Sequence, residues 1–153
     1  MDVEQLQVGD AIPAFTRATG FPVWNRYAAV NDEFIPIHMD DAAGQEAGFG
    51  GAIGMGNLQW AYVHNLLREW IGEDGEVLRV SCQFRRPNLA GQTVTAQGTV
   101  TGLEHVGGAA VVDLDVVVAD QDGNQLVSGT ARVRVPAHVN QPTDDASEVG
   151  AAV

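Results

Sequence analysis

Apolar and polar residues recur with two different periods along this chain, and the change of period divides it. Between residues 57 and 71 the apolar side chains cover more than one face of a helix, which predicts a long, largely buried helix. After that helix, apolar residues alternate with polar ones, a period of two that is typical of half-buried strands. Four segments have this pattern: 78–84, 93–101, 109–119 and 126–135.

Turn residues between these segments predict how the strands connect. Gly107-Gly108 and Asp122-Gly123-Asn124 have the glycines that hairpin turns favour. We therefore expect a meander of four antiparallel strands after the buried helix. One helix followed by such strands indicates an α+β domain in which an antiparallel sheet wraps around the helix.

The first third of the chain contains the signals of two shorter helices. The first begins at Thr19-Gly20-Phe21-Pro22, where the proline lies near the first helical position. This helix has one apolar face. Pro36 makes the segment 31–36 irregular, because proline lacks an N–H and restricts the residue before it. Asp40 can cap a second helix at 41–47, which Gly48 ends.

Length and composition predict a single domain. The chain has 153 residues, 45% of them hydrophobic, and we assign 1–136 to the domain and 137–153 to a disordered tail. It has no apolar run long enough to span a membrane and no secretory signal pattern, so we expect a cytoplasmic protein. The single cysteine, Cys82, cannot form an internal disulfide and matches no zinc spacing.

Charge excludes two classes of partner. The formal net charge is −12, and all eight basic residues are arginine. Such a chain repels nucleic acid and anionic membranes, so we expect it to bind neither. An anionic ligand would need a local arginine cluster.

Three residues between positions 33 and 56 suggest chemistry. Glu33 lies five residues before His38, and Gly56 lies eighteen residues after that histidine, at the start of the long helix. A carboxylate, an imidazole and a free backbone N–H can activate water, move a proton and polarise a thioester carbonyl. Each also has a structural interpretation: His38 as a buried histidine, Gly56 as a close packing contact, and Glu33 as part of a solvated acidic turn with Asp32.

Several matched positions then make the chain resemble a known family. Segment 27–58, together with Ser81-Cys82-Gln83-Phe84-Arg85-Arg86-Pro87, resembles the MaoC-like (R)-specific enoyl-CoA hydratases and dehydratases, which have the hotdog fold. The family motif reads Asp-x-Asn-Pro-(Ile/Leu)-His-x-Asp, then Gly-Phe, then Ile-x-His-Gly-Met-Leu. The positions kept at matching spacing are Pro36, Ile37, His38, Asp40, Gly48, Phe49, Ile53, Gly56 and Leu58. The resemblance covers about residues 8 to 136 and implies a hotdog fold.

Departures from the motif keep three functions open. Glu33 replaces the family aspartate, Ile35 its asparagine, Met55 its histidine and Asn57 its methionine. The resemblance implies a hydratase or dehydratase acting on an α,β-unsaturated acyl thioester. The alternative is a non-catalytic hotdog subunit that shapes the acyl pocket of a catalytic partner. A thioesterase ranks last, because it needs a carboxylate early on the long helix and residues 57–60 offer none.

The resemblance also implies roles for individual residues. Glu33, or Asp32 in its place, would activate water; His38 would transfer the proton; and the Gly56 N–H would bind the thioester oxygen. The residues assigned to substrate binding are Tyr27, Phe49, Ile53, Met55, Asn57, Tyr62, Arg85 and Arg86. We expect no metal and no cofactor beyond the coenzyme A or carrier protein of the thioester. The expected assembly is a homodimer, or a heterodimer with another hotdog subunit, formed edge to edge because a valine-rich edge strand needs a partner.

Overall fold

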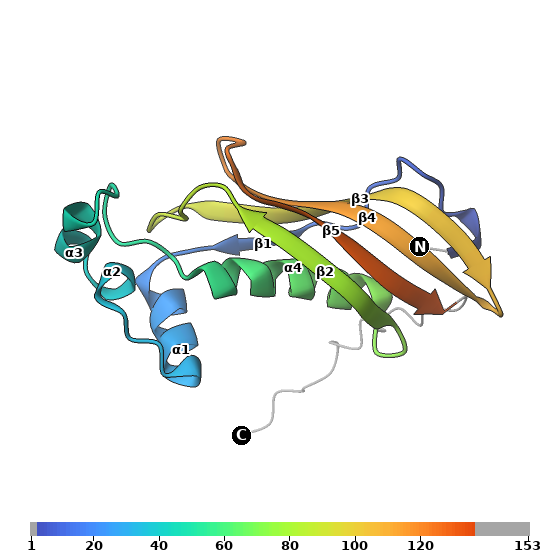
Figure 1. The fold of residues 1–153 in the computed structure, drawn as a ribbon, viewed down its shortest axis with the longest axis horizontal. Helices are drawn as coiled ribbons and strands as arrows, with labels where there is room; N and C mark the ends of the chain where they lie inside the picture. Colours follow the sequence, from blue (N-terminus) through green and yellow to red (C-terminus); the bar gives the residue numbers. More distant parts are fainter. Residues whose placement is uncertain (1–2, 137–153) are drawn as a thin grey trace, which may run out of the picture.

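A long helix lies against one face of a five-stranded antiparallel sheet that curves around it (Figure 1). The computed structural model describes residues 3–136, so the expected disorder of 137–153 lies outside the described residues. This arrangement is the hotdog fold that the resemblance implies. The elements in chain order are η1 (Val3–Gln5), β1 (Phe15–Ala18), α1 (Phe21–Asn31), α2 (Pro36–Met39), α3 (Asp41–Glu46), α4 (Gly56–Ile71), β2 (Glu76–Phe84), β3 (Thr93–Val106), β4 (Ala109–Asp120) and β5 (Gln125–Pro136).

The order of the strands corrects the expected meander. The sheet runs β1-β3-β4-β5-β2, so only β3, β4 and β5 are joined by the predicted hairpins. β2 pairs with β5 rather than with β3, its neighbour in sequence, so the connection 85–92 has to pass β5 and β4 to reach β3. The sequence pattern predicted the strands but not their neighbours. It also missed β1, whose four residues include only one that is buried.

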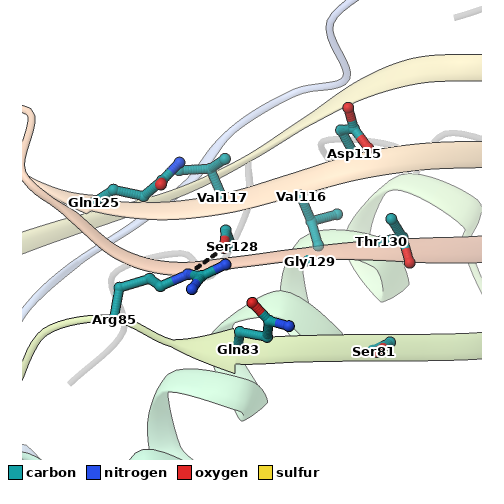
Figure 2. Close-up of a pocket in the computed structure, with 10 residues that line it drawn as sticks. All are labelled: Ser81, Gln83, Arg85, Asp115, Val116, Val117, Gln125, Ser128, Gly129 and Thr130. Carbon is teal, nitrogen blue, oxygen red and sulfur yellow. Dashed lines mark hydrogen bonds between the residues drawn. The ribbon is translucent and has the colours of Figure 1, made fainter.

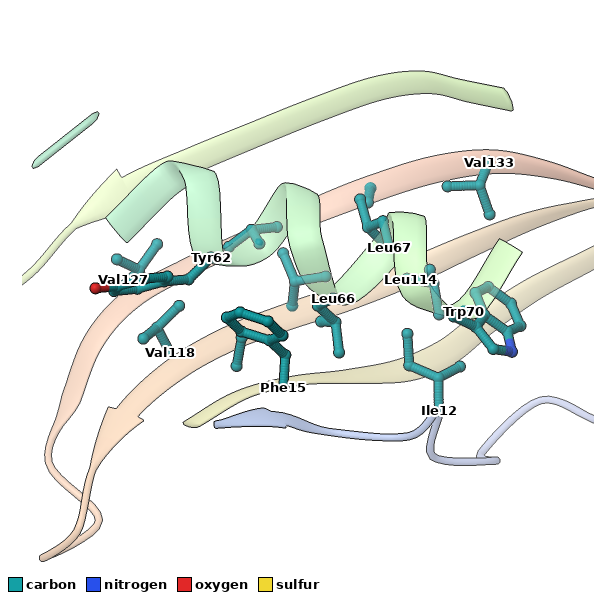
Figure 3. Close-up of a cluster of buried hydrophobic side chains, with 14 of the residues drawn as sticks. Ile12, Phe15, Tyr62, Leu66, Leu67, Trp70, Leu114, Val118, Val127 and Val133 are labelled. Atoms are coloured by element: carbon teal, nitrogen blue, oxygen red, sulfur yellow. The ribbon is translucent and has the colours of Figure 1, made fainter. Parts of the chain in front are cut away.

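The core lies between α4 and the inner face of the sheet, as the periodicity predicts. Leu66, Leu67 and Trp70 of the helix face Leu114 and Val133 of the strands (Figure 3). The buried residues of α4 are Leu58, Gln59, Tyr62, Val63, Leu66, Leu67, Trp70 and Ile71. None of the helices between residues 3 and 136 combines the length and apolar character that crossing a membrane requires.

The three short helices gather at the N-terminal end of α4 (Figure 1). α1 has its proline in the first turn, as predicted, and ends at Asp32 in the left-handed conformation (φ 52°, ψ 41°). Pro36 then begins α2, a four-residue helix that was not predicted from the sequence. The Oδ1 of Asp40 accepts the Ala43 N–H at 2.8 Å, which confirms Asp40 as the N-cap of α3.

The two edges of the sheet are β1 and β2. The longer of them, β2, pairs with β5 along one side only. It also exposes two large apolar side chains, Leu78 at 44% and Phe84 at 53%. A single chain therefore presents an apolar strand edge of the kind that sheets pair or cover.

Candidate active site

His38 is held from one side by the segment before α4. Its side chain is buried, and Nδ1 lies 2.7 Å from the carbonyl oxygen of Ile53. Because a carbonyl oxygen can only accept, Nδ1 carries the hydrogen, and Nε2 is the nitrogen left for other chemistry. A backbone hydrogen bond joins the same two segments, since the Ile53 N–H donates to the Ile37 carbonyl at 3.0 Å. The ring orientation thus depends on where Ile53 lies.

Glu33 follows the left-handed turn that ends α1. Its N–H donates to the Ala28 carbonyl at 3.0 Å, and its side chain is half-buried whereas that of Asp32 is exposed. The carboxylate lies close enough to Tyr27 to act on its hydroxyl: burial raises the pKa of Tyr27, and the negative charge of Glu33 raises it further. Glu33 is therefore the less exposed of the two acidic residues, and its charge acts on a neighbouring side chain of α1.

Gly56 is the first residue of α4, immediately after the extended N-cap Met55. The first N–H groups of a helix have no partner within that helix and lie at the positive end of its dipole. Ile53, which binds His38, is only three residues earlier in the same segment. The free N–H groups at the start of α4 are therefore candidate donors to an anionic oxygen.

A hollow of about 400 Å³ lies between α1 and α4, and Glu33, His38 and Gly56 are not among the residues that line it. Its lining joins α1 to the first turns of α4 and consists of Tyr27, Asn57, Trp60, Ala61, His64 and Asn65. Of this lining, Tyr27 is acted on by the charge of Glu33, and Asn57 follows Gly56 in α4. Trp60 and His64 meet edge to face with ring centres 5.3 Å apart. Neither residue was selected from the sequence, although their i, i+4 spacing outside the buried stripe of α4 was a usable signal.

Four residues assigned to substrate binding do not line this hollow. Met55 and Tyr62 are buried at 0% and 3% exposure, in the core rather than along the hollow. Burial raises the pKa of Tyr62 to about 12, an effect that the charge of Arg17 partly offsets. Ile53 contributes its backbone to His38 and pairs with Leu89 in an isolated bridge. Phe49 is half-buried, with its N–H bonded to the Gly44 carbonyl at 2.9 Å.

The two arginines are separated from this group. Arg85 lies on the face of the sheet that points away from α4, where its Nε donates to Ser128 Oγ at 3.0 Å (Figure 2). It lines a second hollow of about 420 Å³ between β2, β5 and β4, together with polar residues such as Gln83 and Asp115. Arg86 is exposed, and its charge acts on Asp120. Their assignment to phosphate binding stays a prediction.

Other chemistries have little support in the described part of the chain. Among residues 3–136, no three His, Cys, Asp or Glu side chains are grouped so as to hold a metal ion. Cys82 lies half-buried on β2, and burial raises the pKa of its thiol, which disfavours the nucleophilic thiolate.

Comparison with known proteins identifies the family. The family model of the MaoC like domain matches residues 22–122. The (R)-specific enoyl-CoA hydratase of Aeromonas caviae is 28% identical over 137 residues, which cover 89% of this chain and all of that protein.

Solved structures agree on the fold. The (R)-hydratase from Aeromonas caviae involved in PHA biosynthesis superposes with a TM-score of 0.77 and 28% identity, over 87% of this chain and 99% of that one. The ChsH1-ChsH2 complex from Mycobacterium tuberculosis gives a TM-score of 0.73 at 19% identity, over 84% of this chain and 98% of that one. With a family model matched over more than half its length, the chain belongs to the MaoC-like domain family.

Proposed function

We propose that this chain adds water to, or removes it from, an α,β-unsaturated acyl thioester. The observation that carries the proposal is the hydrogen bond from His38 Nδ1 to the Ile53 carbonyl, because it leaves Nε2 to exchange a proton with substrate. The 28% identity to an (R)-specific enoyl-CoA hydratase, over the whole length of that enzyme, supports the reaction class.

In the proposed hydration, Glu33 and His38 act on opposite ends of one water addition. The Glu33 carboxylate accepts a proton from water as the water oxygen bonds to the β-carbon. The imidazolium of His38 gives its Nε2 proton to the α-carbon, while its Nδ1–H remains hydrogen-bonded to the Ile53 carbonyl. The Gly56 N–H binds the enolate oxygen that develops between these two events. The proton on Glu33 then returns to His38, and dehydration follows the same steps in reverse.

The acyl group would occupy the hollow between α1 and α4. The volume of about 400 Å³ and the mixed lining, with an exposed Trp60 and polar Asn57, suit a chain of several carbons. Arg85 and Arg86, on the strand end and connection beyond Phe84, are the proposed contacts of coenzyme A phosphates.

A non-catalytic subunit is the second candidate, and two observations favour it. Ile35 and Met55 stand where the family motif has polar residues, and Met55 is fully buried. The fold is also that of a solved complex between two different chains. A thioesterase is disfavoured, since the first turn of α4 has no acidic residue.

The test is hydration of crotonyl-CoA and longer enoyl-CoA substrates by the purified chain, followed by loss of the conjugated absorbance. His38→Ala and Glu33→Gln should each lower kcat by about 10²-fold or more. Asp32→Asn is the matched control and should change kcat little. Activity that survives both substitutions would remove these residues from the mechanism. No activity alone, with activity restored by a second hotdog protein, would establish the partner-subunit alternative.

A further inference from the structure

A connected set of buried polar side chains lies behind the candidate active site. Its centre is Asn88, in the connection from β2 to β3, which is 1% exposed. Thr19 and Asp120 belong to the same set and are each 7% exposed. Buried polar groups are costly unless they are hydrogen-bonded, so such a set indicates that its geometry is needed.

The amide of Asn88 is fixed by its donors. Nδ2 lies 3.0 Å from Thr19 Oγ1 and 3.0 Å from Gln92 Oε1. Gln92 Oε1 also accepts the Leu89 N–H at 2.7 Å, and Gln92 Nε2 donates to Asp120 Oδ2 at 2.9 Å. Asn88 and Leu89 are therefore both tied to the side chain of Gln92.

Asp120 anchors the far end of the set at the turn between β4 and β5. Its two oxygens accept from Gln92 Nε2, Asn124 Nδ2, Asn124 N–H and Asp122 N–H. The hydrogen bond from the Asn124 side chain is the main reason that the pKa of Asp120 lies below its usual value. Asp120 therefore stays an ionised acceptor at neutral pH. The Gln92 amide must then turn its Nε2 toward Asp120 and its Oε1 toward Asn88 and Leu89.

At its other end, the set is hydrogen-bonded to the segment 53–54, which orients His38. The Gly54 N–H donates to the Asn88 carbonyl at 2.7 Å, and Ile53 pairs with Leu89. Gly54 packs closely on the same side chain, since a Cβ there would lie 2.9 Å from Asn88 Oδ1. Ile53 carries the carbonyl that binds His38 Nδ1 at 2.7 Å. A movement of Ile53 by about 1 Å would take this oxygen beyond hydrogen-bonding distance.

We propose that Asn88 is a positioning residue for His38. Its side chain fixes the 88–89 backbone, that backbone fixes Ile53 and Gly54, and the Ile53 carbonyl then holds His38 in the tautomer with hydrogen on Nδ1. The kinetic part of this inference rests on the proposed function, whereas the tautomer can be measured in a protein without activity.

The first test is imidazole ¹⁵N NMR of the full chain, with the His38 signals identified by their loss in His38→Ala. In its neutral form, wild-type His38 should carry the hydrogen on Nδ1. Asn88→Ala should shift these signals toward the mixture of tautomers that a solvated imidazole adopts. Asn124→Ala is the matched control: it removes one of the four donors to Asp120, at the far end of the same hydrogen-bonded set, and does not touch 88–89 or 53–54, so it should shift the His38 signals much less than Asn88→Ala does. A folded Asn88→Ala with wild-type His38 signals would overturn the proposal.

The second test separates positioning from substrate binding. Asn88→Ala should lower kcat about 10-fold and change KM less than about 2-fold, since the substrate contacts remain. Thr19→Val removes one acceptor of Asn88 with little change of shape, and should shift the His38 signals in the same direction by less. If Asn88→Ala does not fold, Thr19→Val replaces it in the NMR experiment. Wild-type His38 signals in Thr19→Val would then overturn the proposal. If wild type has no turnover but its His38 signals move in Asn88→Ala, the proposed function fails and the positioning role stands.

Discussion

The outer edge of the Phe84 ring, at the end of β2, is the group nearest to the position that a Cβ of Gly56 would occupy at the start of α4. A Cβ at residue 56 would lie 3.6 Å from Phe84 Cζ, an ordinary van der Waals distance. Two residues earlier the situation differs, because a Cβ at Gly54 would lie 2.9 Å from Asn88 Oδ1 and 3.0 Å from Trp24 Nε1. The two glycines are therefore present for different reasons.

This contrast gives a paired prediction. Gly54→Ala should lower the free energy of unfolding by about 1–3 kcal/mol, because both Trp24 and Asn88 are buried and cannot move aside freely. Gly56→Ala should change it by less than about 1 kcal/mol, since the methyl fits beside Phe84. Urea unfolding of the two variants measures the difference. Equal losses would show that the space at residue 56 is misjudged.

Periodicity and turn residues were sufficient for the elements of this fold but not for their arrangement. The buried stripe of α4 and the alternation in β3, β4 and β5 are local patterns that follow directly from which face meets the core. The pairing of β2 with β5 is non-local, and nothing in the connection 85–92 states which strand its neighbours will join. β1 was missed since a four-residue strand with one buried side chain has no period to detect.

The candidate site was partly predictable for the same reason. Glu33, His38 and Gly56 lie within one short stretch, so spacing and family resemblance could select them together. Asn88 is 50 residues from His38 in sequence and acts through backbone atoms of Ile53 and Gly54, which no motif encodes. The hollow needs α1 and α4 to be placed relative to each other, so Trp60 and His64 emerged only from the structure.

Asp40 should be a helix cap rather than a catalyst, despite lying two residues from His38. Asp40→Ala removes the acceptor of the Ala43 N–H and should cost about 1 kcal/mol of stability. Asp40→Asn keeps a side-chain oxygen and should lose much less. Thermal unfolding compares the two, and hydratase assays should show kcat within a few-fold of wild type for both. A loss of about 10²-fold in folded Asp40→Asn would instead place Asp40 in the chemistry.

Asp32 occupies a conformation that suits glycine. It is the one non-glycine residue with positive φ among residues 3–136, and its side chain is exposed. Asp32→Gly should leave the free energy of unfolding within about 1 kcal/mol of wild type, because relief of the left-handed conformation offsets the greater freedom of the unfolded chain. Asp32→Val should be clearly destabilising, since a β-branched residue disfavours this conformation. Circular dichroism on heating distinguishes them, and an Asp32→Val protein as stable as wild type would contradict the assignment.

The open edge of β2 predicts an assembly of at least two hotdog chains. Leu78 is 44% exposed on that strand, and Leu78→Asp should weaken the association by placing a charge in an apolar strand pairing. Val106→Asp is the matched control, because Val106 is 52% exposed at the end of β3, away from the β2 edge. Light scattering should give at least twice 16.2 kDa for wild type and the control. A mass of 16.2 kDa for wild type at micromolar concentration would contradict self-association through this edge.

Tyr62 should make the protein less stable in alkali. Its side chain is 3% exposed and its hydroxyl has no hydrogen-bond partner within the described residues. Burial raises its pKa to about 12, whereas an unfolded tyrosine titrates near pH 10. The unfolded chain therefore releases this proton first, so the stabilising contribution is complete below about pH 10 and is lost as the pH rises toward 12.

Tyr62→Phe tests both consequences. At pH 7 the variant should be as stable as wild type or more stable by up to about 1 kcal/mol, because it removes a buried hydroxyl that has no partner. Between about pH 10 and 12, wild type should lose on the order of 2 kcal/mol more than the variant. The pH dependence that remains in the variant includes Tyr27, whose pKa burial and Glu33 also raise. Urea unfolding across this range gives the two profiles. Parallel profiles would mean that the Tyr62 hydroxyl reaches solvent or a partner in the folded protein.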